Sequence, residues 1–348
     1  MKRLRGLQAM AGCLVLLAAP VWAQVQGAGA SFPSKVYERW AQTFEKSTGI
    51  KVAYTATGSA DGLKQITART VQLGGSDTPL PPEELARRKL IQLPMLVGGI
   101  VPVVHLPGVA DNQLRLTGEL LADIMAGRVR QWNDPRIAAL NAGLALPAQP
   151  IRRIVRSDKS GTTEGLTRYL AGASDAFKAE PGVSQLPKWT GDVLAVEGND
   201  GMVKALRATP GAIAYVSHDR VERDQLVAVK LRNAAGNYVA ASEAGFRSAV
   251  VESELSRRGD DAASLMDRPG PATWPITMTS FLLVDAEPAR ADAASPAVRF
   301  VYWCFMHGDD LTRGTGFAPI PVALQSRLAG RLMAVKAQDG KLLSYLGM

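Results

Sequence analysis

The chain has few of the residues from which metal centres and disulfide scaffolds are built. Among its 348 residues there are two cysteines and three histidines. Cys13 and Cys304 lie in such different surroundings that they form neither a disulfide framework nor a zinc cluster. None of the three histidines, at positions 105, 218 and 307, stands at metal-ligand spacing with another ligand. A disulfide-stapled domain and a zinc enzyme are therefore excluded.

Recognisable catalytic motifs are missing as well. The sequence holds no Gly-x-Ser-x-Gly elbow and no P-loop. Hydrolysis of a phosphate ester would need an activated nucleophile or a pair of metal ions, and the sequence offers neither pattern. We therefore expect a protein that is not an enzyme and that uses no cofactor.

The N-terminus has the pattern of a cleavable leader. A basic stub at residues 1–5 precedes the apolar run 13–19, and Ala23 ends a plausible cleavage site. A membrane anchor is the alternative, but the run is short for a span. A lipoprotein box at residues 10–13 is disfavoured because almost no apolar region precedes it. We predict a signal peptide over residues 1–23 and export to the periplasm.

Charge gives a weaker indication. The full chain carries a formal net charge of +8. Lys2, Arg3 and Arg5 leave with the leader, so 37 basic and 32 acidic side chains remain and the net charge falls to +5. The basic residues are scattered among acidic ones, whereas a nucleic-acid binder gathers them into a stripe with aromatics. No nucleic-acid partner is expected, although a modest positive balance favours the approach of an anion.

The pattern of apolar residues alternates between short strands and amphipathic helices. A helix is predicted over residues 34–47, a strand over 50–54, and a strand, Gly-Gly turn and second strand over 95–106. Further on, the pattern predicts strands at 151–155, 211–216 and 280–284, and helices at 62–69, 117–125, 135–140, 163–170, 296–306 and 321–332. This alternation indicates an α/β protein, and the length favours two domains.

Three turns place a hydroxyl residue beside glycine just before a predicted helix. They lie at residues 27–33, 57–62 and 157–162, and Arg156 precedes the third. A helix N-terminus exposes unpaired N–H groups and partial positive charge, while glycine lets an anion approach the backbone. Each turn alone is most simply a helix cap. Three in one chain predict an anion-binding cradle.

These same segments resemble the periplasmic phosphate-binding protein of the high-affinity phosphate ABC transporter. The matching segments follow in order and spacing over nearly the whole mature chain: Gly27-Ala28-Gly29-Ala30-Ser31-Phe32-Pro33, Thr57-Gly58-Ser59, Gly75-Ser76-Asp77-Thr78-Pro79-Leu80, Gln131-Trp132-Asn133-Asp134, Leu140-Asn141, Arg156-Ser157-Asp158-Lys159-Ser160-Gly161-Thr162, Gly198-Asn199-Asp200-Gly201, Pro210-Gly211-Ala212-Ile213-Ala214-Tyr215-Val216 and Trp274-Pro275-Ile276-Thr277. The resemblance implies a type 2 periplasmic binding protein fold, with two lobes around a cleft.

The resemblance also implies which residues bind the ligand. The first turn would give backbone N–H groups and a hydroxyl, and the carboxylate of Asp77 would accept a proton from the bound anion. Arg156 would supply a cationic fork. The implied site is Ala30, Ser31, Phe32, Ser59, Asp77, Arg156, Asp158, Ser160, Gly161 and Thr162. Simpler interpretations stay open: an Asx-turn for Asp77, a surface ion pair with Asp158 for Arg156, and a core position for Phe32.

Lobe boundaries and partners follow from the same resemblance. Residues 24–100 and 275–348 would form lobe I and residues 101–274 lobe II, with crossover strands within 93–106 and 274–284. The expected partners are inorganic phosphate and the membrane permease of a phosphate ABC transporter, and the protein is expected to be a monomer.

One position departs from the family pattern. After Ser59 the family usually continues with small residues, whereas this chain has Asp61. A carboxylate turned toward the ligand would repel a dianion. The sequence therefore leaves open another oxyanion, or a phosphorylated or phosphonate solute; an exported phosphatase is less favoured.

Overall fold

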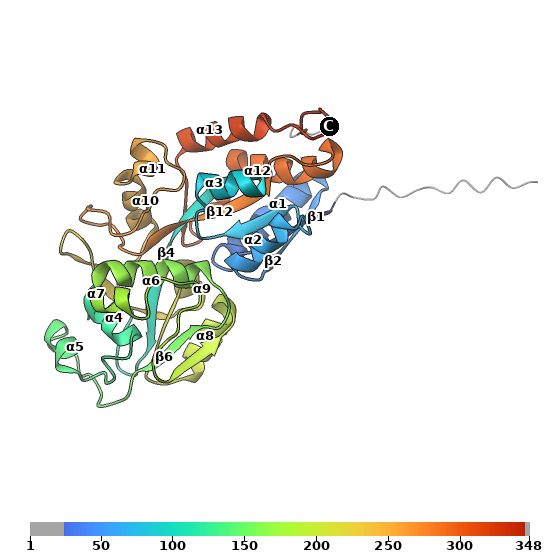
Figure 1. Ribbon diagram of the computed structural model, residues 1–348. Helices are drawn as coiled ribbons and strands as arrows, with labels where there is room; N and C mark the ends of the chain where they lie inside the picture. The colour runs from blue at the N-terminus through green and yellow to red at the C-terminus, as the bar shows by residue number, and fades with distance from the viewer. Residues whose placement is uncertain (1–23, 345–348) are drawn as a thin grey trace, which may run out of the picture.

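The computed structural model describes residues 24–344 (Figure 1), and the predicted signal peptide, residues 1–23, lies outside the described residues. The strands are β1 (Gln24–Gly29), β2 (Lys51–Ala56), β3 (Leu73–Ser76), β4 (Leu90–His105), β5 (Arg115–Leu116), β6 (Arg152–Arg156), β7 (Val193–Val196), β8 (Ala212–Ser217), β9 (Val227–Ala228), β10 (Lys230–Arg232), β11 (Tyr238–Val239), β12 (Thr277–Asp285) and β13 (Phe317–Pro319).

The helices agree with most of the predicted ones to within a few residues. They are α1 (Ser34–Thr48), α2 (Ser59–Thr67), α3 (Pro82–Arg88), α4 (Gly118–Met125), α5 (Pro135–Leu140), α6 (Gly161–Ala173), α7 (Asp175–Ala179), α8 (Gly198–Ala208), α9 (His218–Arg223), α10 (Glu243–Val251), α11 (Glu254–Arg257), α12 (Ala291–Thr312) and α13 (Val322–Met333). Within residues 24–344 no helix is both long and apolar enough to cross a membrane.

The main sheet runs through both halves of the molecule. Its strand order is β2-β1-β3-β12-β4-β8-β6-β7, and β9 and β13 also pair with β4. Strands β1, β2 and β3 are parallel at one end, and β6, β7 and β8 are parallel at the other. Between them β12 and β4 are antiparallel. A smaller sheet has the order β11-β10-β5.

Strand β4 connects the two lobes. Its residues 90–99 pair with β12, and its residues 100–105 pair with β8. In Figure 1 helices α1, α2, α3, α12 and α13 lie around the upper part of the sheet, while α4 to α9 lie around the lower part. The chain therefore has the two-lobe α/β fold that the sequence predicts. The lobe boundaries at residues 100 and 274 stay a prediction.

The predicted Gly-Gly turn is wrong, because β4 continues through both glycines. A Cβ on Gly98 would lie 2.6 Å from the ring of Phe317 and 2.9 Å from that of Phe32. A Cβ on Gly99 would lie 2.3 Å from the ring of Phe246. The two glycines thus let aromatic rings pack directly on the backbone of a buried strand, which is a close-approach role rather than a turn.

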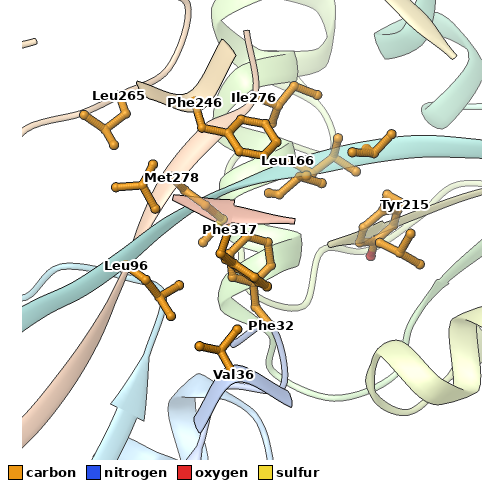
Figure 2. Close-up of a cluster of buried hydrophobic side chains, with 14 of the residues drawn as sticks. Phe32, Val36, Leu96, Leu166, Tyr215, Phe246, Leu265, Ile276, Met278 and Phe317 are labelled. Atoms are coloured by element: carbon orange, nitrogen blue, oxygen red, sulfur yellow. The ribbon is translucent and has the colours of Figure 1, made fainter. Parts of the chain in front are cut away.

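Those rings belong to a buried cluster where the lobes meet (Figure 2). Phe32 and Phe317 pack edge to face, with ring centroids 5.1 Å apart. Leu166 and Tyr215 come from α6 and β8 of the lower lobe, and Val36 comes from α1 of the upper lobe. All five side chains are almost fully buried. The turn that follows β1 is therefore fixed against both lobes by the core behind it.

Candidate functional site

The three glycine–hydroxyl turns converge where parallel strands end. The first follows β1, the second follows β2 and the third follows β6, and Asp77 comes directly after β3. In open α/β sheets ligands bind outside the carboxyl ends of such strands. The fold therefore places the turns of the upper lobe opposite the turn of the lower lobe.

Close contacts show how near the turns lie to one another. A Cβ on Gly161 would lie 2.4 Å from Ser59 Oγ and 2.7 Å from Asp77 Cβ. A Cβ on Gly58, whose φ is +93°, would lie 3.0 Å from Asp158 Oδ2. Within the upper lobe, the carbonyl of Gly29 accepts hydrogen bonds of 2.8 Å from the N–H groups of residues 57 and 58. The three predicted turns form one cluster across the lobes.

Two helices point their N-termini into this cluster. Helix α2 begins at Ser59 with no side-chain cap, and α6 begins at Gly161, two residues before the predicted start. The earlier start is explained by Ser160, whose Oγ accepts from the N–H of Thr163 at 3.2 Å. The first N–H groups of a helix have no partner within the helix. The cluster therefore combines several free backbone donors with partial positive charge.

Three buried serine hydroxyls are oriented as donors. Ser59 Oγ accepts from the N–H of Asp77 at 3.2 Å, and Ser160 Oγ accepts from the backbone of α6. Ser31 Oγ accepts from Asn199 Nδ2 at 3.2 Å. A hydroxyl that accepts from an N–H group keeps its own proton for another partner. Ser31 and Ser160 can therefore donate to an anion bound between the lobes, and the hydroxyl of Ser59 lies within reach of the Asp77 carboxylate as well.

Arg156 lies beneath these groups and is 2% exposed. Its Nε donates to Asp158 Oδ1 at 2.7 Å, and its Nη2 donates to Asp158 Oδ2. Although burial alone would raise the pKa of Asp158, the hydrogen bond and charge of Arg156 lower it. The third nitrogen, Nη1, is buried and has no hydrogen-bond partner in the described part of the chain. One edge of the guanidinium is thus held by Asp158, and Nη1 remains for a second anion.

Asp77 is the one acceptor of the cluster that titrates near neutrality. Burial raises its pKa to about 7, whereas the hydrogen bond from Ser280, the charge of Arg156 and the hydrogen bond from Ser59 lower it. Ser280 Oγ donates to Asp77 Oδ1 at 2.7 Å. In its ionised form this carboxylate accepts hydrogen bonds only, so it requires a ligand that carries a proton.

The first turn, at residues 27–33, has fewer backbone groups available for a ligand than the prediction assigned to it. The N–H of Ala30 donates to the carbonyl of Gly75 at 3.0 Å, and the carbonyl of Ala30 accepts from Tyr54 Oη at 2.9 Å. The side chain of Phe32 packs in the core, as the simpler interpretation has it. Backbone binding by this turn stays a prediction, and it concerns the N–H groups of Ser31 and Phe32.

The carboxylate of Asp61 is turned along its own helix. Its Oδ2 accepts from Nε2 of Gln65, which lies one turn further along α2. It is therefore engaged on the side of the helix rather than free to face a ligand. Asp61 should therefore repel a bound anion less than the sequence suggested.

Several contributors carry no clear signal in the sequence. Asn199 lies in the first turn of α8, is 1% exposed and reaches across the lobes to Ser31. Tyr215 Oη accepts from the N–H of Arg156 at 3.1 Å and bonds Thr163 Oγ1 at 2.8 Å. Ser280 lies in an apolar strand. Asn199 and Tyr215 stand in segments that the resemblance covers, 198–201 and 210–216, and it assigns no role to either.

A cavity of about 600 Å³ adjoins the cluster, and Asp77 is part of its wall. It is lined from both lobes and is mainly apolar, with Leu80, Leu265, Met278 and Phe281 among its walls. Among residues 24–344 no group of three or more His, Cys, Asp or Glu side chains is arranged to hold a metal ion.

Comparisons with known proteins agree with this geometry. The family model described as a PBP superfamily domain matches residues 17–305. A phosphate-binding protein PstS of Haemophilus influenzae is 38% identical over 305 residues, which cover 87% of this chain and 91% of that protein. Another, from Xylella fastidiosa, is 35% identical over 305 residues, covering 88% and 84%.

A solved structure gives the same fold. The phosphate-binding protein from Stenotrophomonas maltophilia superposes with a TM-score of 0.69 and covers 89% of this chain and 94% of that one, at 20% identity. At this identity the likeness shows the fold, while the relatives above show the family. The chain therefore belongs to the PBP superfamily and, within it, to the PstS family of phosphate-binding proteins.

Proposed function

We propose that this protein captures inorganic phosphate between its lobes and that the predicted residues from Ser31 to Thr162 bind it. The observation that carries the proposal is the set of donors around the carboxylate of Asp77. Buried serine hydroxyls, two helix N-termini and the free Nη1 of Arg156 donate, and Asp77 is the acceptor, since the carboxylate of Asp158 is held by Arg156. Phosphate near neutral pH offers many acceptor oxygens and at least one proton, which is the complementary pattern.

The transport role rests on family membership and on the leader. Relatives at 35–38% identity carry the name phosphate-binding protein PstS. With a cleavable leader, the mature chain would act as a monomer in the periplasm and deliver phosphate to the membrane permease of an ABC importer. The site residues hold a ligand but include no nucleophile paired with a general base, so binding without turnover is expected.

Ligand binding should stabilise the purified mature protein. A ligand that binds only the folded state adds about 2.7 kcal/mol at a hundredfold excess over its dissociation constant. We expect phosphate to raise the melting temperature and to give a one-to-one isotherm in calorimetry. Absence of any thermal shift with phosphate would contradict the proposal. Release of phosphate from a panel of esters, abolished in Ser59→Ala, would favour the phosphatase instead.

The same titration separates phosphate from the other solutes left open by the sequence. Sulfate, arsenate and small phosphonates are titrated in parallel. The apolar cavity beside Asp77 offers room for an organic substituent, so tighter binding of a phosphonate than of phosphate would replace inorganic phosphate as the ligand. Equal or weaker binding keeps the proposed function.

Gly161→Ala should weaken phosphate binding. The added methyl group would lie 2.4 Å from Ser59 Oγ, so the lobes could not approach each other as they do here. Gly172→Ala is the matched control, because it lies in the same helix and a Cβ there meets nothing within 4 Å. We expect a loss of affinity in calorimetry only for the first variant. Equal affinities for the two variants would mean that the turns need not approach this closely.

A further inference from the structure

Ser280 reaches the ligand cluster from a strand rather than from a turn. It lies on β12, is fully buried, and donates from Oγ to Asp77 Oδ1 at 2.7 Å. The pairing of β12 with β4 shifts register between Ser280 and Phe281. Such an irregularity re-aims the side chains beside it. The hydroxyl of Ser280 is therefore directed at the carboxylate by the backbone of a central strand, not by a mobile loop.

Of the other groups around Asp77, the hydroxyl of Ser59 also favours the ionised carboxylate, but its hydrogen bond contributes less than that of Ser280. Arg156 acts on the carboxylate through its charge, and its fork is held by Asp158. The phenols of Tyr37 and Tyr54 are buried, and burial raises the pKa of both well above the usual value, so both stay neutral. Among the interactions that favour the charged carboxylate, the hydrogen bond from Ser280 is the largest.

The hydroxyl hydrogen of Ser280 on Oδ1 of Asp77 has two consequences. It holds Oδ1 and so restrains the rotation of the carboxylate. It also favours the ionised form, which accepts hydrogen bonds but cannot donate one. A protonated carboxyl could donate to sulfate, and a rotated one could turn its acceptor away from the ligand. Either change would weaken the distinction between an anion that carries a proton and one that does not.

We propose that Ser280 is a specificity-determining residue, which positions Asp77 so that the site selects protonated oxyanions over sulfate. The proposal rests on the proposed function and adds to it a residue outside the three turns. Ser280 itself touches Asp77 and not the ligand, so its effect should appear in selectivity and in pH dependence more than in phosphate affinity.

The test compares Ser280→Ala with Ser280→Thr, which keeps a hydroxyl on a β-branched side chain suited to a strand. Dissociation constants of phosphate and of sulfate are measured by calorimetry on both sides of pH 7, near the pKa of Asp77. Above pH 7 we expect the preference for phosphate, measured as the dissociation constant of sulfate divided by that of phosphate, to fall about tenfold to a hundredfold in Ser280→Ala. This is the effect of one hydrogen bond to a charged group. The pH above which sulfate is excluded should rise. Ser280→Thr should restore both.

Thr279→Val is the matched control. It removes a buried hydroxyl from the neighbouring position of the same strand, and Thr279 Oγ1 has no hydrogen-bond partner among the described residues. It should leave the ratio and its pH profile unchanged. The proposed role of Ser280 is wrong if Ser280→Ala has the same ratio and pH profile as the unaltered protein, or if Thr279→Val changes them equally. Phosphate capture would stand in either case. If the unaltered protein binds no phosphate, the proposed function fails first.

Discussion

Asp77→Asn is expected to abolish most of the discrimination against sulfate. Above pH 7 the carboxylate of Asp77 is mainly ionised, because its pKa is about 7. Phosphate can donate a proton to it, whereas sulfate would set its own lone pairs against those of the carboxylate. A site that requires a hydrogen bond from its ligand rejects an analogue without one by factors of about 10⁴ to 10⁵. An asparagine amide can donate, so the rejection should disappear.

Calorimetry with both anions above pH 7 measures this ratio directly. Sulfate should bind much more tightly to Asp77→Asn than to the unaltered protein, while phosphate affinity changes less. Asp61→Gly is the control, because the Asp61 carboxylate is already bound by Gln65 and should not affect the ratio. Equal binding of sulfate and phosphate by the unaltered protein would show that Asp77 does not detect the ligand's proton. A changed ratio in Asp61→Gly would assign that role to Asp61.

The ratio should also depend on pH in the unaltered protein. As pH falls through about 7, Asp77 takes up a proton and becomes able to donate to sulfate. Sulfate binding should therefore strengthen below pH 7, and Asp77→Asn should lose this dependence because the amide does not titrate there. A flat profile for sulfate in the unaltered protein would contradict a carboxylate that titrates near neutrality.

Much of the site could be predicted because its signals are local in the sequence. A hydroxyl beside glycine before a helix marks an anion-binding helix N-terminus wherever it occurs, and Arg156 and Asp158 are only two residues apart. The structure brings the three predicted turns together because parallel strands place their carboxyl ends at one edge. The backbone role of Ala30 was predicted less well, since the carbonyl that binds its N–H belongs to Gly75, 45 positions later.

The features that were missed depend on neighbours far away in the chain. Gly98 and Gly99 look like a turn, and their actual role depends on the rings of Phe246 and Phe317. Ser280 stands in an apolar run, so nothing beside it indicates that it bonds Asp77, 203 positions earlier. Pairwise contacts of this kind have no local pattern, and only the folded arrangement of β3, β4 and β12 reveals them.

Arg156→Lys tests whether the fork of the guanidinium, and not only its charge, binds the anion. Lysine keeps the positive charge but presents a single ammonium, so it cannot bond Asp158 with two nitrogens and still donate from a third. Loss of one charge-assisted hydrogen bond should weaken phosphate binding by about 1.5 to 3 kcal/mol. Arg156→Ala should weaken binding further, and it should also destabilise the fold, because it leaves the carboxylate of Asp158 without its cationic partner.

Because Arg156→Ala changes stability as well as binding, the lysine variant is the sharper measurement. Its control is Arg152→Lys, which lies on the same strand, is exposed and forms no ion pair within the described residues. Calorimetry should show reduced phosphate affinity for Arg156→Lys and unchanged affinity for Arg152→Lys. Unchanged affinity in both Arg156 variants would place the anion away from Nη1. The buried guanidinium would then serve only to hold Asp158. The carboxylate of Asp158 in turn accepts a hydrogen bond of 3.1 Å from the N–H of Gly198.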